Sequence, residues 1–329
     1  MLGICLAQPD DKVRVAFYNL ENLFDPSDDT LKNDEEFTPQ GQRYWSNYRY
    51  REKSHRMAKA ILSIGEWDAP DIVGVAEIEN RKVLEDLVQS PVLAKFDYDI
   101  IHFESPDRRG IDVGMIYRRD RFTLIASRNI PVTTPEDPGF ATRDILYASG
   151  TIFSGDTIHL FYCHWPSRYG GQQQSEPKRI LAALTVKKIT DSILNTDPLA
   201  TIIVAGDFND EWTNYSLKDV LEARVPETNS KPKTLYNLMA AMDAAAGSHR
   251  YRGQWAYLDQ VIVSNGLLNN SGVEAWEHRA FIVSHDFLLE TDEKYPGSQP
   301  FRTFIGMKYH GGFSDHLPVY IDLYKEVPE

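Results

Sequence analysis

The sequence predicts an α/β protein in which two β-sheets pack together and helices cover them. Three observations predict this fold: strand-like segments occur along the whole chain, few long helical segments separate them, and several strands end abruptly in a polar side chain. Many strands with few long helices favour packed sheets flanked by helices. Because the polar strand ends run from residue 19 to residue 316 and would form one site, we expect a single domain over residues 13–329.

Composition is that of an ordinary globular protein. The chain has 329 residues, of which 42% are hydrophobic and 25% charged, and no apolar run approaches the roughly 20 residues that cross a bilayer. The net charge is −13, because 48 acidic residues outnumber 35 basic ones. This balance argues against a protein that coats nucleic acid by overall charge, but it allows a local phosphate site or bound divalent cations. We expect a monomer without a stable protein partner.

The first twelve residues are expected to lie outside the domain. Residues 2–7 resemble the end of an export signal, although a basic beginning and a long apolar stretch are missing. Either a clipped signal or a short leader accounts for them, and the segment favours export over a cytoplasmic location. Two cysteines are too few for a disulfide scaffold. Cys163 lies in an apolar run and is predicted to be a buried thiol, while a single bridge to Cys5 stays possible.

The N-terminal half is predicted to mix strands and helices. Alternation and β-branched residues predict a strand over 13–20, and residues 25–50 read as a long acidic and aromatic loop. Apolar residues at helical spacing predict a helix over 51–64, which is followed by an apolar strand over 72–76 and a second helix over 82–88. Further strands are expected at 98–103, 113–117, 123–127, 146–153 and 157–164.

The C-terminal half begins with the longest predicted helix, over 176–194. Its expected apolar stripe consists of Ile180, Leu181, Leu184, Ile189 and Ile193. The fully apolar run 201–206 is typical of a strand buried on both faces. Short helices and loops are expected over 213–250, and residues 265–311 are expected to be mostly irregular. Strands over 258–264 and 317–324 complete the prediction.

An apolar strand that ends in a carboxylate, amide or imidazole recurs along the chain. These strand ends carry Asn19, Glu21, Glu77, His164, Asp207, Asn209, Asp259, Asp315 and His316. Side chains at i and i+2 share one face of a strand, so Asp207 and Asn209 can point together. Carboxylates at the mouth of an apolar sheet would gather a hard cation such as Mg²⁺ or Mn²⁺. The sequence has no Cys/His spacing of a structural zinc site.

This order of motifs resembles the endonuclease/exonuclease/phosphatase family, which includes DNase I-like nucleases, abasic-site endonucleases, neutral sphingomyelinases and inositol polyphosphate phosphatases. The most specific motifs are residues 206–209 and 314–318, with the Glu77 strand upstream. The resemblance covers about residues 13–324. It implies a four-layer α/β sandwich, in which two mainly antiparallel or mixed β-sheets are flanked by helices.

The resemblance also implies a role for each catalytic position. Asp207 matches the aspartate that orients or deprotonates the attacking water, and Asn209 matches an amide that binds a phosphate oxygen. His316 matches the histidine that contacts the scissile phosphate, and Asp259 matches the carboxylate that buttresses it. His164 is similar to a strand-end histidine of DNase I-like and sphingomyelinase members. The sequence lacks a nucleophile-elbow pattern, so we expect no covalent intermediate.

The expected metal ligands come from three strand ends. Glu77 resembles the metal-binding glutamate of the family, and Asp315 matches an aspartate that binds the metal or supports its ligands. Glu21 stands where several members carry an aspartate. Asn19 resembles the asparagine that helps hold the metal site and phosphate. A divalent cation at such ligands neutralises the negative charge that develops on phosphate oxygens during hydrolysis.

Other residues allow either a functional or a structural interpretation. Arg109, beside Arg108, and Arg168 could contact phosphate or could simply be solvated, and Trp255 could stack on a base or sugar or pack in the core. The aromatic residues Tyr44, Trp45, Tyr48 and Tyr50 could form a substrate lid or pack the long loop onto the body. The acidic residues within 28–36 could bind Ca²⁺ or form a solvated loop.

Two functions stay open at this point. The first is a metal-dependent phosphodiesterase that acts on nucleic acid, with DNA expected, because residues 20–22 and 77–80 resemble bacterial secreted or surface nucleases. The second is a phosphatase or phosphodiesterase that acts on a small or lipid-linked phosphate, which the acidic balance favours. Complete motifs argue against a catalytically silent binding module.

Overall fold

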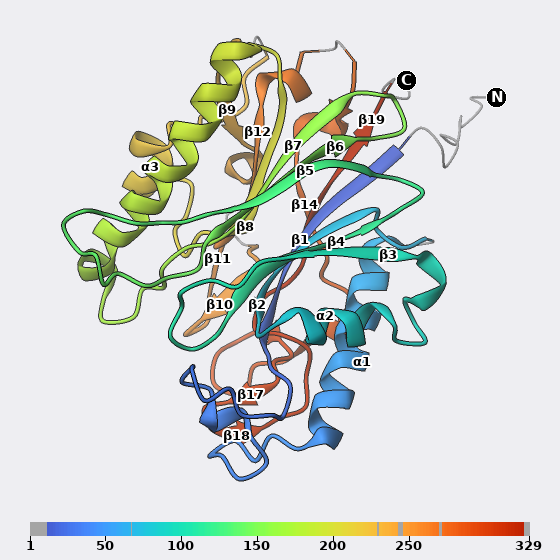
Figure 1. Ribbon diagram of the computed structural model, residues 1–329, viewed down its shortest axis with the longest axis vertical. Coiled ribbons are helices and arrows are strands. Elements are labelled where there is room, and N and C mark those ends of the chain that lie inside the picture. The colour runs from blue at the N-terminus through green and yellow to red at the C-terminus, as the bar shows by residue number, and fades with distance from the viewer. Residues whose placement is uncertain (1–11, 67, 229, 243–245, 270–271, 326–329) are drawn as a thin grey trace.

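Two β-sheets of seven and six strands form the centre of the protein (Figure 1). The structure is a computed structural model that describes residues 12–66, 68–228, 230–242, 246–269 and 272–325. Helices lie outside the two sheets, which confirms the predicted four-layer α/β sandwich. The predicted leader and Cys5 lie outside the described residues, except that Lys12 is already the first residue of β1.

The first sheet brings the two ends of the chain together. Its central strand β1 pairs antiparallel with β19 and parallel with β2. Since parallel neighbours need a crossover connection, helix α1 (Asn47–Ile64) lies between β1 and β2 along the chain. The strand order is β13 (Glu274–Ala275), β19 (Val319–Tyr324), β1 (Lys12–Leu23), β2 (Ile72–Ile78), β4 (Asp112–Arg118) and β3 (Tyr98–His102), with β14 (Phe281–Ile282) also paired to β19.

The second sheet has the same mixed character. Its strands β7 and β8 are parallel and are joined by helix α3 (Gln172–Thr196), whereas the other pairs are antiparallel. The strand order is β5 (Thr123–Ile130), β6 (Ile145–Thr151), β7 (Thr157–His164), β8 (Thr201–Asp207), β12 (Asp259–Ser264) and β9 (Leu235–Asn237).

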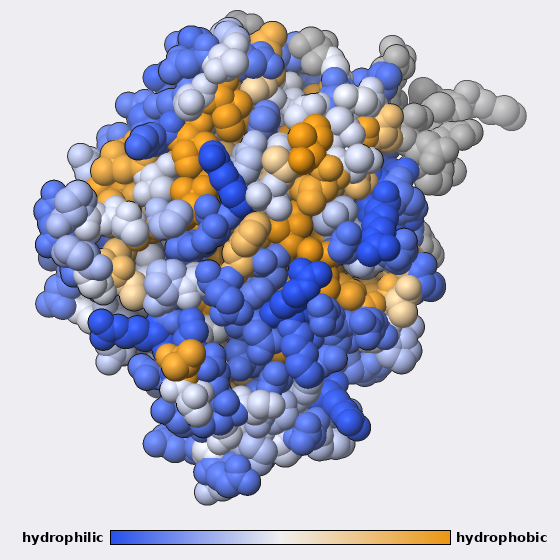
Figure 2. Space-filling model, in the orientation of Figure 1, coloured by the Kyte–Doolittle hydropathy of each residue, from blue (hydrophilic) through white to orange (hydrophobic). Residues whose placement is uncertain are grey.

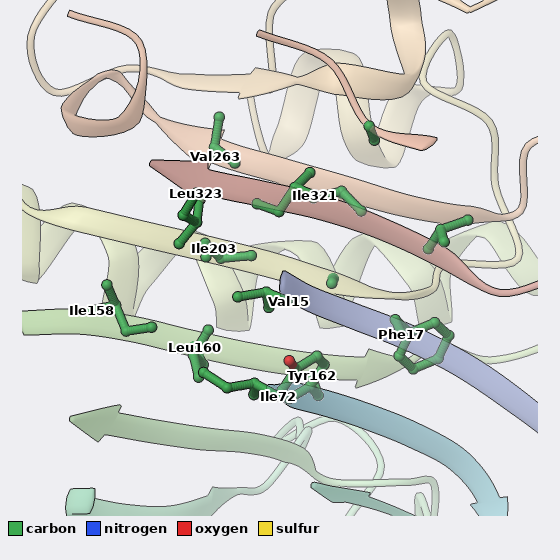
Figure 3. Packing of buried hydrophobic residues seen from close by; sticks show 14 of the residues in the cluster. Val15, Phe17, Ile72, Ile158, Leu160, Tyr162, Ile203, Val263, Ile321 and Leu323 are labelled. Carbon is green, nitrogen blue, oxygen red and sulfur yellow. The ribbon is translucent and has the colours of Figure 1, made fainter. Parts of the chain in front are cut away.

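One hydrophobic cluster fills the space between the two sheets. Figure 3 shows Val15 and Phe17 of β1 close to Leu160 and Tyr162 of β7, with Ile203 of β8 beside them. The packing leaves no room for a side chain at Gly74, because a Cβ atom there would lie 1.9 Å from the ring of Tyr162. The close approach of the sheets therefore depends on glycine at this position.

Two further clusters attach the helices. Helices α1 and α2 (Arg81–Val88) cover the outer face of the first sheet, and the predicted apolar residues Met57, Ala60, Ile61 and Ile64 are buried there. Helix α3 covers the second sheet through Ala182, Ala183 and Val186. The stripe predicted for α3 is wrong in its centre, since Leu184 is 51% exposed and small residues face the sheet.

Helix α3 also begins earlier than predicted. The predicted start is residue 176, but the helix begins at Gln172. The buried guanidinium of Arg179 donates to the carbonyl of Gln172 at 3.0 Å and pairs with Asp210 at 2.7 Å. These contacts stabilise an additional turn that Pro177 would otherwise weaken.

The region 265–311, expected to be mostly irregular, contains short strands. Two or three residues are too few to show an alternating pattern, so these hairpins have no clear sequence signal. They are β15 (Leu289–Thr291) with β16 (Ser298–Pro300) and β17 (Phe304–Ile305) with β18 (Lys308–Tyr309), and the preceding region adds β10 (His249–Tyr251) with β11 (Gln254–Ala256). Short helical turns occur at Glu35–Phe37, Ala94–Phe96, Ser216–Val220, Leu238–Ala241, Asn265–Leu267, Trp276–His278 and Asp286–Leu288.

Two remaining predictions concern single features. Cys163 is a buried free thiol, as the apolar run around it predicts. None of the helices in the described ranges combines the length and hydropathy that a membrane span requires.

In the space-filling view, hydrophilic residues predominate over the lower half of the visible face, and hydrophobic residues show mainly across its middle and upper parts (Figure 2).

Candidate active site

Strand register places three of the predicted residues in one row of the second sheet. His164 pairs with Asp207 across β7 and β8, and Asp207 pairs with Asp259 across β8 and β12. From the facing sheet, the amide of Asn19 on β1 donates to Asp207 Oδ2 at 3.2 Å. The ends of both sheets therefore meet at Asp207.

Asp207 lies at the centre of this group. His164 Nε2 is 3.6 Å and His316 Nε2 is 3.8 Å from Asp207 Oδ2, while the backbone N–H of Asn209 donates to Oδ1 at 2.9 Å. Burial raises the pKa of Asp207 to about 7, and the positive charge of His316 opposes this rise. A carboxylate with such a pKa can accept a proton near neutral pH.

His316 and Asp259 form a tight buried pair. Nδ1 of His316 lies 2.6 Å from Asp259 Oδ2. Burial disfavours the charged imidazole, but the carboxylates of Asp259 and Asp207 outweigh it and raise the pKa of His316 well above its ordinary value. The segment that carries His316 is held against β1 by Ser314, whose hydroxyl donates to the carbonyl of Asn19 at 2.7 Å. The site thus contains an imidazolium whose Nε2–H is available beside Asp207.

His164 has the opposite electrostatic environment. Burial and the nearby guanidinium groups of Arg143 and Arg109 lower the pKa of His164 well below its ordinary value, so its imidazole is neutral. Its Nε2 is 3.7 Å from Glu77 Oε1, a distance too long for a hydrogen bond. Nδ1 has no hydrogen-bond partner within the described part of the chain.

Glu77 is placed by an irregular backbone. Its φ is +60°, and the pairing of β2 with both neighbouring strands shifts around this residue. The backbone N–H of Asn22 donates to Glu77 Oε2 at 3.0 Å, and Asn22 itself has a φ of +55°. Glu21 and Asn209 also have positive φ. Such conformations are uncommon outside glycine and occur preferentially at functional sites.

The sequence matches one protein family over nearly its whole length. The family described as "Endonuclease/Exonuclease/phosphatase family" matches residues 14–325. The chain belongs to this family. Membership places it among enzymes that hydrolyse phosphoester bonds, and it confirms the resemblance seen in the motifs at residues 206–209 and 314–318.

Solved structures of the family have the same fold. An endonuclease/exonuclease/phosphatase family protein from Bacteroides thetaiotaomicron aligns with a TM-score of 0.59 at 15% identity, covering 96% of this chain and 98% of the other. A mannosyl-6-phosphatase from the same organism aligns with a TM-score of 0.58 at 17% identity, covering 94% and 99%. TDP2 of D. rerio complexed with a single-strand DNA product gives a TM-score of 0.54 at 16% identity, covering 95% and 98%. No curated protein matches this chain by sequence.

Within this family member, Glu21 has partners other than a metal ion. Its carboxylate accepts from the backbone N–H of Thr303 at 2.7 Å and of Phe304 at 3.4 Å, and Arg302 Nε is 3.5 Å away. Burial, with Asp315 nearby, raises the pKa of Glu21 to about 7. These contacts hold residues 302–304 against β1, and a metal-binding role for Glu21 stays a prediction.

Asp315 is also paired with a cation. Arg302 Nη2 donates to Asp315 Oδ2 at 2.8 Å. Although burial would raise the pKa of Asp315, the charges of Arg302 and His316 lower it to about 2. Asp315 is therefore ionised, and its predicted metal role is untested.

Asn209 and Arg168 support one another. Arg168 Nε donates to the carbonyl of Asn209 at 2.7 Å, and the amide of Asn209 donates to the carbonyl of Trp165 at 3.1 Å. Arg168 thus holds the backbone of a predicted phosphate-binding residue. Direct contact between Arg168 and phosphate stays a prediction.

Arg109 and Trp255, the remaining substrate-binding candidates, lie in two different hollows. Arg109 Nε is 3.3 Å from Asp107, and Arg109 lines a cavity on the His164 side. Trp255 is half-buried in a separate hollow that Met242 and Leu317 also line. The structure therefore brings Arg109 near the catalytic group and gives Trp255 an apolar environment.

The aromatic loop is partly packed against the body. Trp45 is fully buried and donates to the carbonyl of Phe24 at 2.8 Å, and the hydroxyl of Tyr50 donates to Asp86 at 2.6 Å. Tyr44 and Tyr48 are exposed, at 68% and 71%. The packing interpretation thus holds for Trp45 and Tyr50.

Two residues at the site had no signal in the sequence. The ring of His249 on β10 lies 4.7 Å from the ring of His316, and burial lowers the pKa of His249 to about 4. Arg143 donates to the carbonyls of His164 at 3.2 Å and Trp165 at 2.6 Å. Neither His249 nor Arg143 belongs to a recognisable sequence motif. Only the contacts formed in the folded chain bring these two residues to the site.

Glu77 offers the type of oxygen ligand that a hard divalent cation prefers. Glu77 is partly exposed at the site, its polar neighbours include a backbone N–H and a neutral imidazole, and no described lysine or arginine forms an ion pair with it. Carboxylate and amide oxygens of Glu77 and Asn19 are ligands that Mg²⁺ and Mn²⁺ prefer.

Proposed function

We propose that the protein is a metal-dependent phosphodiesterase that hydrolyses nucleic acid, with DNA as the expected polymer. The observation that carries the proposal is the placement of Asp207 between a neutral histidine and a protonated one, with Glu77 beside them. A base, an acid and a candidate cation ligand are the groups that in-line attack of water on a phosphodiester requires. The relative complexed with a single-strand DNA product supports the choice of polymer.

Asp207 would act on the attacking water. Its Oδ1 is held by the N–H of Asn209 and its Oδ2 by the amide of Asn19, so the carboxylate is oriented before substrate binds. As the water oxygen attacks phosphorus, its proton passes to Asp207, the bond between phosphorus and the leaving oxygen breaks, and the leaving alkoxide takes a proton from solvent water. Because the pKa of Asp207 is raised to about 7, the residue accepts that proton at a small free-energy cost.

His316 would stabilise the phosphate. With Nδ1 bound to Asp259, the protonated ring can donate from Nε2 to a nonbridging oxygen as negative charge increases there. His164, which is neutral, can contribute a hydrogen bond without adding charge. Glu77, with Asn19 and Asp315 as further candidates, would hold a divalent cation, which when bound neutralises part of the phosphate charge.

A panel of substrates tests this proposal. Plasmid DNA, abasic duplex, RNA, sphingomyelin, inositol phosphates, mannose 6-phosphate and bis-p-nitrophenyl phosphate would each be incubated with Mg²⁺ or Mn²⁺. We expect cleavage of DNA and slower cleavage of bis-p-nitrophenyl phosphate. Chelation should abolish both activities while the circular dichroism spectrum is retained. Full turnover after exhaustive removal of metal would reject the metal dependence.

A small phosphorylated substrate is the second candidate. A mannosyl-6-phosphatase shares the fold over 94% of this chain, and the net charge of −13 disfavours a long polyanion. If only phosphomonoesters such as mannose 6-phosphate are hydrolysed, this candidate replaces the first.

A further inference from the structure

A cavity of about 860 Å³ opens beside the His164 end of the catalytic row. Four segments form its walls: the loop between β3 and β4, the loop between β5 and β6, the loop between β7 and α3, and the beginning of α3. We call it the Arg108 cavity. Its main lining residues for this argument are Arg108, Arg109, Thr142, Arg143, Tyr169 and Lys178.

The Arg108 cavity is positively charged although the chain as a whole is acidic. Four of its lining residues are arginine or lysine, and Asp107 is its sole carboxylate among the described residues. Asp107 is already paired with Arg143 at 3.0 Å and with Arg109 at 3.3 Å. Within the described ranges, no carboxylate lies at ion-pair distance from Arg108 or Lys178, and both are exposed. Their charges are available to an anionic ligand.

Thr142 lines the Arg108 cavity, and its hydroxyl oxygen is buried without a partner among the described groups. Thr142 is 3% exposed, and its Oγ1 makes no hydrogen bond to any described group. A buried polar group that is left unpaired costs free energy, so native proteins usually give it a partner or use it in binding. A phosphate oxygen is a suitable acceptor for this hydroxyl. At the rim, Tyr169 is 93% exposed.

The Arg108 cavity is directly connected to the catalytic row. Arg143 forms part of its wall and donates to the backbone carbonyls of His164 and Trp165. A ligand in the cavity therefore lies next to the strand end that carries His164. A substrate that reaches both places must extend beyond the scissile phosphate.

The hollow on the opposite side of the site has a different charge pattern. It measures about 540 Å³ and is lined, within the described ranges, by five arginine or lysine residues and three carboxylates, which are Arg250, Arg252, Lys294, Arg302, Lys308, Glu290, Asp292 and Glu293. Arg250 is held by Asp292 at 2.9 Å, and Arg302 is held by Asp315 at 2.8 Å. Its three carboxylates make this hollow less strongly positive than the Arg108 cavity, which has one carboxylate among the described residues.

We propose that the Arg108 cavity binds a second phosphate of the substrate, so that the enzyme prefers a polynucleotide strand over a compound with a single phosphate. Arg108 and Lys178 supply charge, and Thr142 supplies a hydrogen bond. This inference rests on the proposed phosphodiesterase function.

The test compares two substrates in the full-length enzyme. One is a short single-stranded oligodeoxynucleotide with a terminal fluorophore, and the other is bis-p-nitrophenyl phosphate, which has one phosphate. In the double variant Arg108→Ala/Lys178→Ala, KM for the oligonucleotide should rise about tenfold or more, while both kinetic constants for bis-p-nitrophenyl phosphate stay unchanged. Lys188→Ala is the matched control, since Lys188 is exposed on the same helix about 15 Å from Lys178.

Two further measurements distinguish substrate binding from a structural role. Oligonucleotide affinity, measured by anisotropy without metal, should depend less on salt in the double variant, and the log–log slope should decrease by about 0.7 for each phosphate that the variant no longer neutralises. Thr142→Val should raise KM for the oligonucleotide without lowering the melting temperature, because it removes an unpaired hydroxyl.

The results that overturn the inference are distinct from those that overturn the function. Equal losses on both substrates, or an unchanged KM for the oligonucleotide, would contradict the second phosphate site while leaving the phosphodiesterase intact. If the wild-type enzyme cleaves neither substrate, the proposed function fails and the inference fails with it.

Discussion

In the second sheet, His164, Asp207 and Asp259 occupy neighbouring positions of regularly paired strands, whereas in the first sheet Glu77 lies where strand pairing shifts. Regular register positions a side chain through the hydrogen bonds of the whole ladder. An interrupted strand positions it through one unusual backbone conformation. The proposed base, Asp207, and its neighbour Asp259 thus depend on the ladder for their positions, and the candidate metal ligand Glu77 depends on local strain.

The two histidines show a similar contrast in electrostatics. His316 faces carboxylates and is protonated, whereas His164 faces guanidinium groups and is neutral. Asp207 lies within 3.8 Å of both rings. Identical side chains therefore differ in protonation because of the charges that surround them.

The largest expected effect separates the proposed base from the proposed metal ligand. Asp207→Asn keeps the size and one acceptor oxygen but removes the basic charge, so turnover should fall by roughly 10²–10⁴-fold with little change in metal affinity. Glu77→Gln should first weaken metal binding and recover partly at high Mg²⁺ or Mn²⁺. Metal titration of both variants is the measurement. Rescue of Asp207→Asn by excess metal, with Glu77→Gln inactive although folded, would reverse the two assignments.

The second prediction concerns the protonated histidine. Because Asp259 raises the pKa of His316, Asp259→Asn should lower that pKa and move the alkaline limb of the rate profile to lower pH. The loss of one charge-assisted hydrogen bond should reduce the rate by about 10- to 100-fold. The pH–rate profile of the variant tests this pairing, and an unchanged profile would contradict it.

The same pair links stability to pH. A group whose pKa is higher in the folded state contributes stability that is fully present below its unfolded pKa of about 6.5. This contribution should be lost as pH rises through the folded pKa of His316. In the wild-type protein the melting temperature should therefore fall on the alkaline side, and the fall should be smaller in Asp259→Asn. Equal alkaline losses in the two proteins would exclude the pair as the cause.

A smaller effect is expected at the neutral histidine. His164→Phe keeps an aromatic ring of similar shape but removes its hydrogen-bonding nitrogens. The rate should therefore fall by about 2- to 10-fold. Both limbs of the pH–rate profile should stay where they are, because His164 carries no proton that is lost in this range. A shifted limb would show that His164 titrates, and the contrast between the two rings would be wrong.

The last prediction concerns stability and tests the strained strand end. At a φ of +55°, Asn22→Val should destabilise the protein by about 1–2 kcal/mol, because a β-branched side chain is disfavoured in the left-handed region. Urea unfolding measures the change. Asn22→Gly is the matched control, since glycine adopts this conformation freely. It also keeps the backbone N–H that donates a hydrogen bond to the carboxylate of Glu77. Similar stability of both variants would argue against strain at this position.

Sequence patterns predicted the main strands and helices because each buries a long apolar run. The strand over 201–206 and the helix over 51–64 are found as β8 and α1, with ends shifted by a few residues. The short hairpins near the C-terminus were missed, since β17 and β18 have only two residues each. The buried face of α3 was misplaced because alanine, which packs closely, carries little hydrophobic signal.

By itself, the sequence determined the family, the sandwich fold and the chemical types at the strand ends, because these depend on periodic apolar runs and on local motifs such as residues 206–209. The tertiary structure decided which imidazole is charged and which partner each carboxylate has. It also brought His249 to His316 and Arg143 to His164. These outcomes depend on distances between residues far apart in the chain and on burial, and neither quantity is contained in a local pattern.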